Sequence, residues 1–85
     1  GGIKVSGKVV SSYANQPLPD AIITISGVDK TVECDSLGRF SVDGVPAKAT
    51  ISVWCPGFYT KEEPVANREQ VQIVMIPEDT FRGFN

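Results

Sequence analysis

The sequence predicts an all-β fold, an antiparallel sandwich of about seven short strands. Apolar and polar residues alternate along five segments, which places one set on a buried face and the other on a solvated face. The same segments are rich in Val, Ile and Thr, which suit strands. No segment shows a convincing i, i+3, i+4 spacing of apolar residues, so we expect no amphipathic helix.

The strands can be placed in order along the chain. Clear alternation covers five segments, namely residues 3–9, 23–26, 39–42, 50–55 and 70–75. Weaker strands are expected over residues 30–34 and 58–65. Within the third of the clear segments, the alternation directs Phe40 into the core.

Turn residues separate these strands. Asp35 and Gly38 hold the first and fourth positions of a predicted type I turn, where the carboxylate caps backbone donors and glycine supplies a positive φ. Pro56 and Gly57 fit the central positions of a type II turn. Residues 35–46 lack the ligand spacing and the closing Glu of a calcium loop, and no helix follows to form a phosphate cradle.

Length and charge narrow the class of protein. The chain has 85 residues and a net charge of −2, which fits one small globular domain. It contains no block of Lys or Arg, so nucleic acid and anionic membrane are not expected partners. We interpret residues 1–2 as a scar of tag removal, residues 3–77 as the domain, and residues 78–85 as a linker towards a following domain.

The order of short motifs resembles the carboxypeptidase regulatory-like domain family. The matching segments are Gly7 with Val9, Pro17 to Ala21, Cys34 to Phe40, Val45-Pro46, residues 51–53 and Gly57-Phe58. Cys34 stands where the family usually has Thr, and Asp20 where it usually has Gly. The resemblance implies a transthyretin-like, Greek-key β-sandwich of seven strands that serves as an accessory module.

The resemblance also implies a setting in the cell. Modules of this family occur at the N-terminus of TonB-dependent outer-membrane transporters of the starch-utilisation type, and they also accompany some metallocarboxypeptidases. We favour the transporter, which implies an exported domain on the periplasmic side of the outer membrane. Its partners would be the plug and barrel of the same chain or another cell-envelope protein, and the module itself would not span the membrane.

Catalysis is not expected of this domain. The sequence contains no His, which excludes a His-based triad and His ligands for zinc. Glu62 and Glu63 are adjacent, so they point to opposite faces of a strand rather than forming a carboxylate pair. We therefore predict no catalytic residues, no metal and no cofactor.

Exposed aromatic residues leave two binding hypotheses open. Trp54 has the opposite parity to its apolar neighbours, and with Tyr59 and Tyr13 it could form a platform for weak glycan contact in a carbohydrate-binding module. Alternatively, Trp54 and Phe58, together with Phe81 and Phe84 of the tail, form a patch that docks a partner domain.

Two cysteines also allow two interpretations. Cys34 and Cys55 end strands that should run in the same direction and share an inward parity. A disulfide between them is compatible with an exported domain. The other interpretation is two free thiols that act as small hydrophobic residues.

Overall fold

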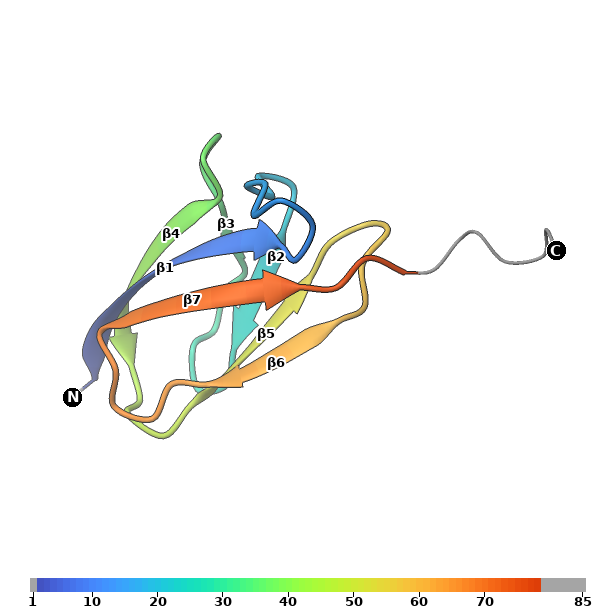
Figure 1. The fold of residues 1–85 in the computed structure, drawn as a ribbon. Coiled ribbons are helices and arrows are strands. Elements are labelled where there is room, and N and C mark those ends of the chain that lie inside the picture. The colour runs from blue at the N-terminus through green and yellow to red at the C-terminus, as the bar shows by residue number, and fades with distance from the viewer. Residues whose placement is uncertain (1, 79–85) are drawn as a thin grey trace, which may run out of the picture.

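The computed structural model describes residues 2–78, and every regular element in this range is a β-strand (Figure 1). Two sheets face each other, one with the order β4-β1-β7 and the other with the order β3-β2-β5-β6. The predicted β-sandwich is confirmed. The strands are β1 (Ile3–Ser11), β2 (Ile22–Ile25), β3 (Val32–Glu33), β4 (Arg39–Val45), β5 (Thr50–Trp54), β6 (Lys61–Pro64) and β7 (Gln70–Met75).

One strand pair departs from the expected antiparallel pattern. The first and last strands, β1 and β7, are parallel, with a register that runs from Ser6 opposite Gln70 to Ser11 opposite Met75. The chain leaves β6 in the other sheet and enters β7 at the same pole from which β1 starts, so the two strands run in the same direction (Figure 1). The remaining pairs, β1–β4, β2–β3, β2–β5 and β5–β6, are antiparallel.

The core lies between the inner faces of the two sheets. The alternation seen in the sequence matches the burial of β7, where Val71, Ile73 and Met75 are buried and the residues between them are exposed. Phe40 on β4 is 5% exposed, so it points inward as predicted. The fully buried side chains of largest volume come from both sheets, and they include Val5, Val9, Ile23, Ile51, Val53, Ile73 and Met75.

The two weak strands are shorter than expected. The segment predicted over residues 30–34 contains only the two-residue β3, and that predicted over residues 58–65 contains the four-residue β6. Both lie at edges of their sheet, where a strand has one neighbour and less burial to extend it. None of the described residues forms a helix that could cross a membrane.

Two tight turns were not predicted. Ala14 and Asn15 have φ of 58° and 52°, and Ala66 and Asn67 have φ of 49° and 57°. Each pair sits inside a four-residue turn closed by an i to i+3 hydrogen bond, from Gln16 N to Tyr13 O and from Arg68 N to Val65 O. Two successive positive φ values match the backbone of a type I′ turn.

Candidate functional site

Large apolar side chains are exposed at one pole of the sandwich, which we call the exit pole. It consists of Tyr13, Trp54, Tyr59 and Ile76, with 73%, 54%, 53% and 57% of their surface exposed. The backbones of these segments are joined there, because Ser12 N donates to Met75 O at 2.8 Å and Tyr59 N donates to Ile76 O at 3.0 Å. The described chain ends at this pole, opposite the pole that holds its N-terminal end (Figure 1).

Trp54 closes β5 and points away from the core. It pairs with Ile22 of β2, which in turn pairs with Glu33 of β3, so these three residues form one row on the outer face of the sheet. Phe58, by contrast, is half-buried and packs against the core. The structure thus brings Trp54 and Tyr59 to one pole but removes Phe58 from the predicted contact patch. Phe81 and Phe84 lie outside the described residues.

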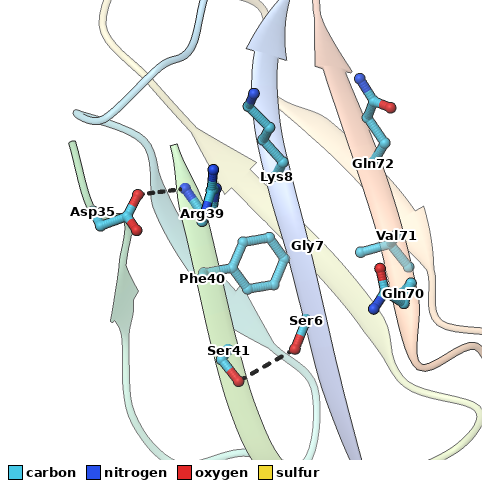
Figure 2. Close-up of a pocket in the computed structure, with 10 residues that line it drawn as sticks. All are labelled: Ser6, Gly7, Lys8, Asp35, Arg39, Phe40, Ser41, Gln70, Val71 and Gln72. Atoms are coloured by element: carbon cyan, nitrogen blue, oxygen red, sulfur yellow. Dashed lines mark hydrogen bonds between the residues drawn. The ribbon is translucent and has the colours of Figure 1, made fainter. Parts of the chain in front are cut away.

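An open pocket of about 750 Å³ lies on the other sheet, over β4, β1 and β7 (Figure 2). The strand register explains its polar lining. Ser6 pairs with both Ser41 and Gln70, and Lys8 pairs with both Arg39 and Gln72, which gives two polar rows across the sheet. Sequence reasoning missed this group, because its members are separated along the chain and only the register of three strands brings them together.

Two cations stand opposite each other in this pocket. Lys8 and Arg39 are cross-strand partners, an arrangement that like charges disfavour. Neither forms a salt bridge within residues 2–78, where the one ion pair joins Arg68 Nη2 to Glu63 Oε2 at 2.8 Å. The Asp35 carboxylate also lines the pocket, so the local charge is mixed rather than purely positive. This arrangement can bind a ligand that carries hydroxyl or anionic groups.

The Asp35 carboxylate is committed to its own turn. Its Oδ1 accepts hydrogen bonds from the backbone amides of Leu37 and Arg39, both at 2.9 Å. Figure 2 shows the bond to Arg39. These two amides, that of Arg39 first, lower the pKa of Asp35. Gly38 N donates to Asp35 O at 2.9 Å, and Gly38 has φ of 76°. Asp35 and Gly38 therefore stand at the first and fourth positions of a closed turn.

Pro56 and Gly57 occupy a second turn, at the exit pole. Phe58 N donates to Cys55 O at 3.1 Å, which closes the four residues, and Gly57 has φ of 86°. A positive φ at the third position is the mark of a type II turn. This turn sends the chain from β5 across to Tyr59, which contributes to the exit pole.

Cys34 and Cys55 are free thiols in the structure, which corresponds to the second of the two interpretations and not to a disulfide. The physical reason is the strand between them. Ile22 of β2 pairs with Glu33 on one side and with Trp54 on the other, so the next residue of β2, Ala21, separates the two cysteines. Two strand spacings amount to about 9.5 Å, beyond the roughly 7 Å that a disulfide allows between Cα atoms.

Burial governs the chemistry of both thiols. Burial, with the nearby Asp35 carboxylate and Cys55, raises the pKa of the Cys34 thiol from 9.0 to about 11. Burial also raises the pKa of Cys55. Neither thiol is therefore a ready nucleophile at neutral pH. Within residues 2–78, no group of three acidic or sulfur-bearing side chains is placed to hold a metal ion.

Comparison with solved structures identifies the same sandwich in other proteins. Two interface mutants of the type II cohesin–X–dockerin complex from Acetivibrio cellulolyticus contain similar chains, with 22% identity and TM-scores of 0.70 and 0.69. The matches cover 92% and 99% of this chain, but only 60% and 64% of those longer chains. At this identity the likeness shows the fold alone.

A third solved structure is similar over nearly its full length. It is the C-terminal domain of the Caf1A usher, whose conserved surface hydrophobic clusters are important for F1 antigen assembly. Its TM-score is 0.61 at 20% identity, over 87% of this chain and 97% of the usher domain. None of the curated proteins is similar enough in sequence to count as a match.

The family model places the chain more narrowly than the fold does. The model of the carboxypeptidase regulatory-like domain matches residues 4–76, which include all of the strands apart from Ile3. The match agrees with the ordered motifs noted in the sequence and with the observed sandwich. This chain belongs to the carboxypeptidase regulatory-like domain family.

Proposed function

We propose that this domain is a non-catalytic accessory module that faces the periplasm at the N-terminus of a TonB-dependent outer-membrane transporter. The observation that carries the proposal is the exit pole. Tyr13, Tyr59 and Ile76 expose apolar surface at the pole where the described chain ends at Glu78, directly before residues 79–85 of the sequence. Exposed apolar groups gathered at such a point favour a neighbouring surface that covers them.

The chemistry of the described residues is consistent with this role. The sequence has no His, the thiols have raised pKa values, and the Asp35 carboxylate is held by its own turn. An accessory module needs a stable frame and a contact surface rather than a reactive group. The frame is the sandwich core, and the contact surface is the exit pole.

The structural neighbours support a role in assembly. The cohesin–X–dockerin chains belong to a complex between proteins, and the usher domain takes part in antigen assembly. In the usher domain the important features are hydrophobic clusters on the surface. By analogy, the hydrophobic side chains of the exit pole are where we expect a plug domain or another cell-envelope protein to bind.

Reading the coding sequence on both sides of the domain tests the placement. We expect a signal peptide shortly before Ile3, and beyond Asn85 a plug domain followed by many alternating segments of about ten residues, the pattern of a transmembrane barrel. A downstream zinc peptidase domain would refute the transporter and favour an accessory role in a metallocarboxypeptidase. Fractionation of cells should place the full-length protein in the outer membrane.

Carbohydrate binding is the second candidate function, favoured by two surfaces. Trp54 is 54% exposed on the outer face of its sheet, and the polar pocket offers Lys8, Gln70 and Gln72 to a hydroxyl-bearing ligand. Calorimetry with a panel of neutral and acidic glycans tests this function. Saturable heat that Trp54→Ala abolishes would assign the aromatic surface, whereas heat that Lys8→Ala abolishes would assign the pocket. If no glycan gave saturable heat, carbohydrate binding would be excluded for that panel and the accessory role would remain as the proposed function.

A further inference from the structure

The four strands at the sheet edges differ in how they are protected from pairing with other chains. Free edges are usually shortened, charged or broken by proline. Three of the four follow this rule: β3 has two residues, β6 reads Lys-Glu-Glu-Pro, and β4 carries Arg39, Asp43 and a Gly44 with φ of 70°. The fourth, β7, reads Gln-Val-Gln-Ile-Val-Met and carries no charge and no proline.

The backbone of β7 alternates between a bonded and a free side. Ser6 N donates to Glu69 O at 2.9 Å and Ser12 N donates to Met75 O at 2.8 Å, so the odd-numbered residues of β7 face β1. The amides and carbonyls of Gln70, Gln72 and Val74 consequently point away from β1. No other strand in the described part of the chain pairs with them.

Directly beyond β7, the same edge of the sheet already forms hydrogen bonds with another segment of the chain. Tyr59 N donates to Ile76 O at 3.0 Å, Glu78 N donates to Gly57 O at 2.9 Å, and Phe58 forms an antiparallel bridge with Pro77. The residues before Gln70 form the turn at Ala66 and Asn67. The open part of the edge is therefore bounded on both sides and measures three outward-facing residues.

We propose that this open edge pairs antiparallel with the same edge of a second copy of the chain. The two-fold axis passes beside Gln72, so Gln72 faces Gln72 of the second copy, and Gln70 faces Val74 on either side. The pairing joins two three-stranded sheets into one six-stranded sheet with the order β4-β1-β7-β7-β1-β4.

The free residues determine the register. Antiparallel strands bond through residues that face each other directly, and only the pairing about Gln72 uses all three free residues of both copies. A slip by two residues in one direction would bring Gln70 opposite Ile76, whose carbonyl is already bonded to Tyr59. A slip in the other direction would leave Val74 opposite Arg68, next to the turn. A slip by one residue would set inward side chains against outward ones.

The side chains of β7 suit a second copy. On the outer face, Val74 is 38% exposed and would be covered by Gln70 of the other molecule, while the two Gln72 amides can bond to each other. On the inner face, Val71 and Ile73 continue the apolar layer from one molecule to the next. The pairing is symmetric, as expected for a homodimer, and no like charges oppose each other within the paired segment.

Charge variants at the axis test the proposal in the 85-residue chain. Sedimentation should show reversible dimers of the unmodified chain. Gln72→Lys and Gln72→Glu should each weaken dimerisation by about three- to fivefold, because the axis places like charges directly opposite each other. An equal mixture of the two variants should dimerise more tightly than either alone, by about tenfold, since opposite charges then meet.

Matched control variants distinguish pairing at the β7 edge from a general effect of added surface charge. Thr24 is exposed on β2, which lies inside the other sheet, so Thr24→Lys and Thr24→Glu should leave dimerisation unchanged, both alone and mixed. Hydrogen exchange should show the amides of Gln70, Gln72 and Val74 protected at high protein concentration and exposed at low concentration. The amides of Val71 and Ile73 should be protected at both.

Three results would overturn the proposal. The first is a chain that stays monomeric at every concentration, and the second is a mixture of the Gln72 variants no tighter than its components. The third is protection of the Gln70, Gln72 and Val74 amides that does not depend on concentration in a longer chain that extends past Asn85. In that case a strand of the same molecule, rather than a second copy, would occupy the edge.

Discussion

Phe40 and Gly7 form one packing unit in the core. A Cβ added to Gly7 would lie 2.5 Å from Phe40 Cζ and 2.8 Å from Val71 Cγ2, so the aromatic ring fills the space that a side chain at position 7 would need (Figure 2). The register places these three residues in one inward row across β4, β1 and β7. Glycine at this position is therefore a requirement of the ring and not of the backbone conformation.

Phe40→Ala should lower the free energy of unfolding by about 3–5 kcal/mol, because it leaves a cavity over Gly7. Urea denaturation monitored by Trp54 fluorescence measures the loss. A loss below about 1 kcal/mol would show that the ring is not an anchor of the core. Gly7→Ala is the companion variant: it should destabilise the unmodified chain but cost less in the Phe40→Ala background, where the space is empty.

The Cys34 thiol gives the domain a pH-dependent contribution to stability. Its pKa in the folded state is about 11, above the 9.0 of an exposed thiol, because burial disfavours the thiolate. The folded state thus prefers the neutral form. The contribution is fully present below pH 9 and is lost as the pH rises through 9 towards 11.

The comparison of the unmodified chain with Cys34→Ser tests this linkage. The unfolding free energy of the unmodified chain minus that of Cys34→Ser should be constant below pH 9 and should fall as the pH approaches 11. All other titratable groups are common to both proteins, so their contributions to the difference cancel. A difference that stays flat or grows would contradict the raised pKa.

At the scale of elements, the two type I′ turns carry strain because their first central residue is alanine. Ala14 and Ala66 hold φ of 58° and 49°, where a Cβ crowds the backbone. Ala14→Gly and Ala66→Gly should each raise the unfolding free energy by about 0.5–1 kcal/mol. Thermal unfolding measures the gain. Ala47→Gly is the matched control, since Ala47 has no positive φ and glycine there should destabilise. If glycine lowered the unfolding free energy equally at positions 14, 66 and 47, the two turns would not be strained.

These turns also show where sequence reasoning reaches its limit. Alternation predicted the inward residues of β4, β5 and β7 because burial of one face imposes a two-residue period. It carries no direction, so it could not reveal that β1 and β7 are parallel. The usual signal of a type I′ turn is Asn-Gly or Asp-Gly, and Ala-Asn does not resemble it.

The candidate sites were predictable to different degrees for the same reason. Trp54 could be placed on an outer face from its parity alone, and the structure leaves it exposed. The polar pocket depends on residues from three strands, which one sequence cannot align. The separation of Cys34 from Cys55 depends on β2 lying between β3 and β5, a matter of sheet order that alternation does not encode.

At the scale of the whole molecule, the two poles have different surroundings. The N-terminal end of β1 lies at one pole, and the exposed side chains of the exit pole lie at the other, where the described chain ends (Figure 1). A module with this layout can be attached to a larger protein through one end without disturbing its core. The polar pocket and the β7 edge then remain accessible along the side of the sandwich.

Deletion of the module from the full-length protein tests its proposed place. The core is formed among residues 2–78, so a transporter that lacks residues 1–77 should still insert its barrel into the outer membrane. We expect it to lose, at most, transport or coupling to TonB, which uptake assays on whole cells measure.

A double variant, Tyr59→Ser with Ile76→Ser, tests the contact surface alone. It should leave the module folded but weaken its contact with the neighbouring domain, which is detectable as faster hydrogen exchange at the exit pole. A barrel that fails to insert without the module would show that it acts in biogenesis, and unchanged exchange in the double variant would show that the exit pole is not the contact surface.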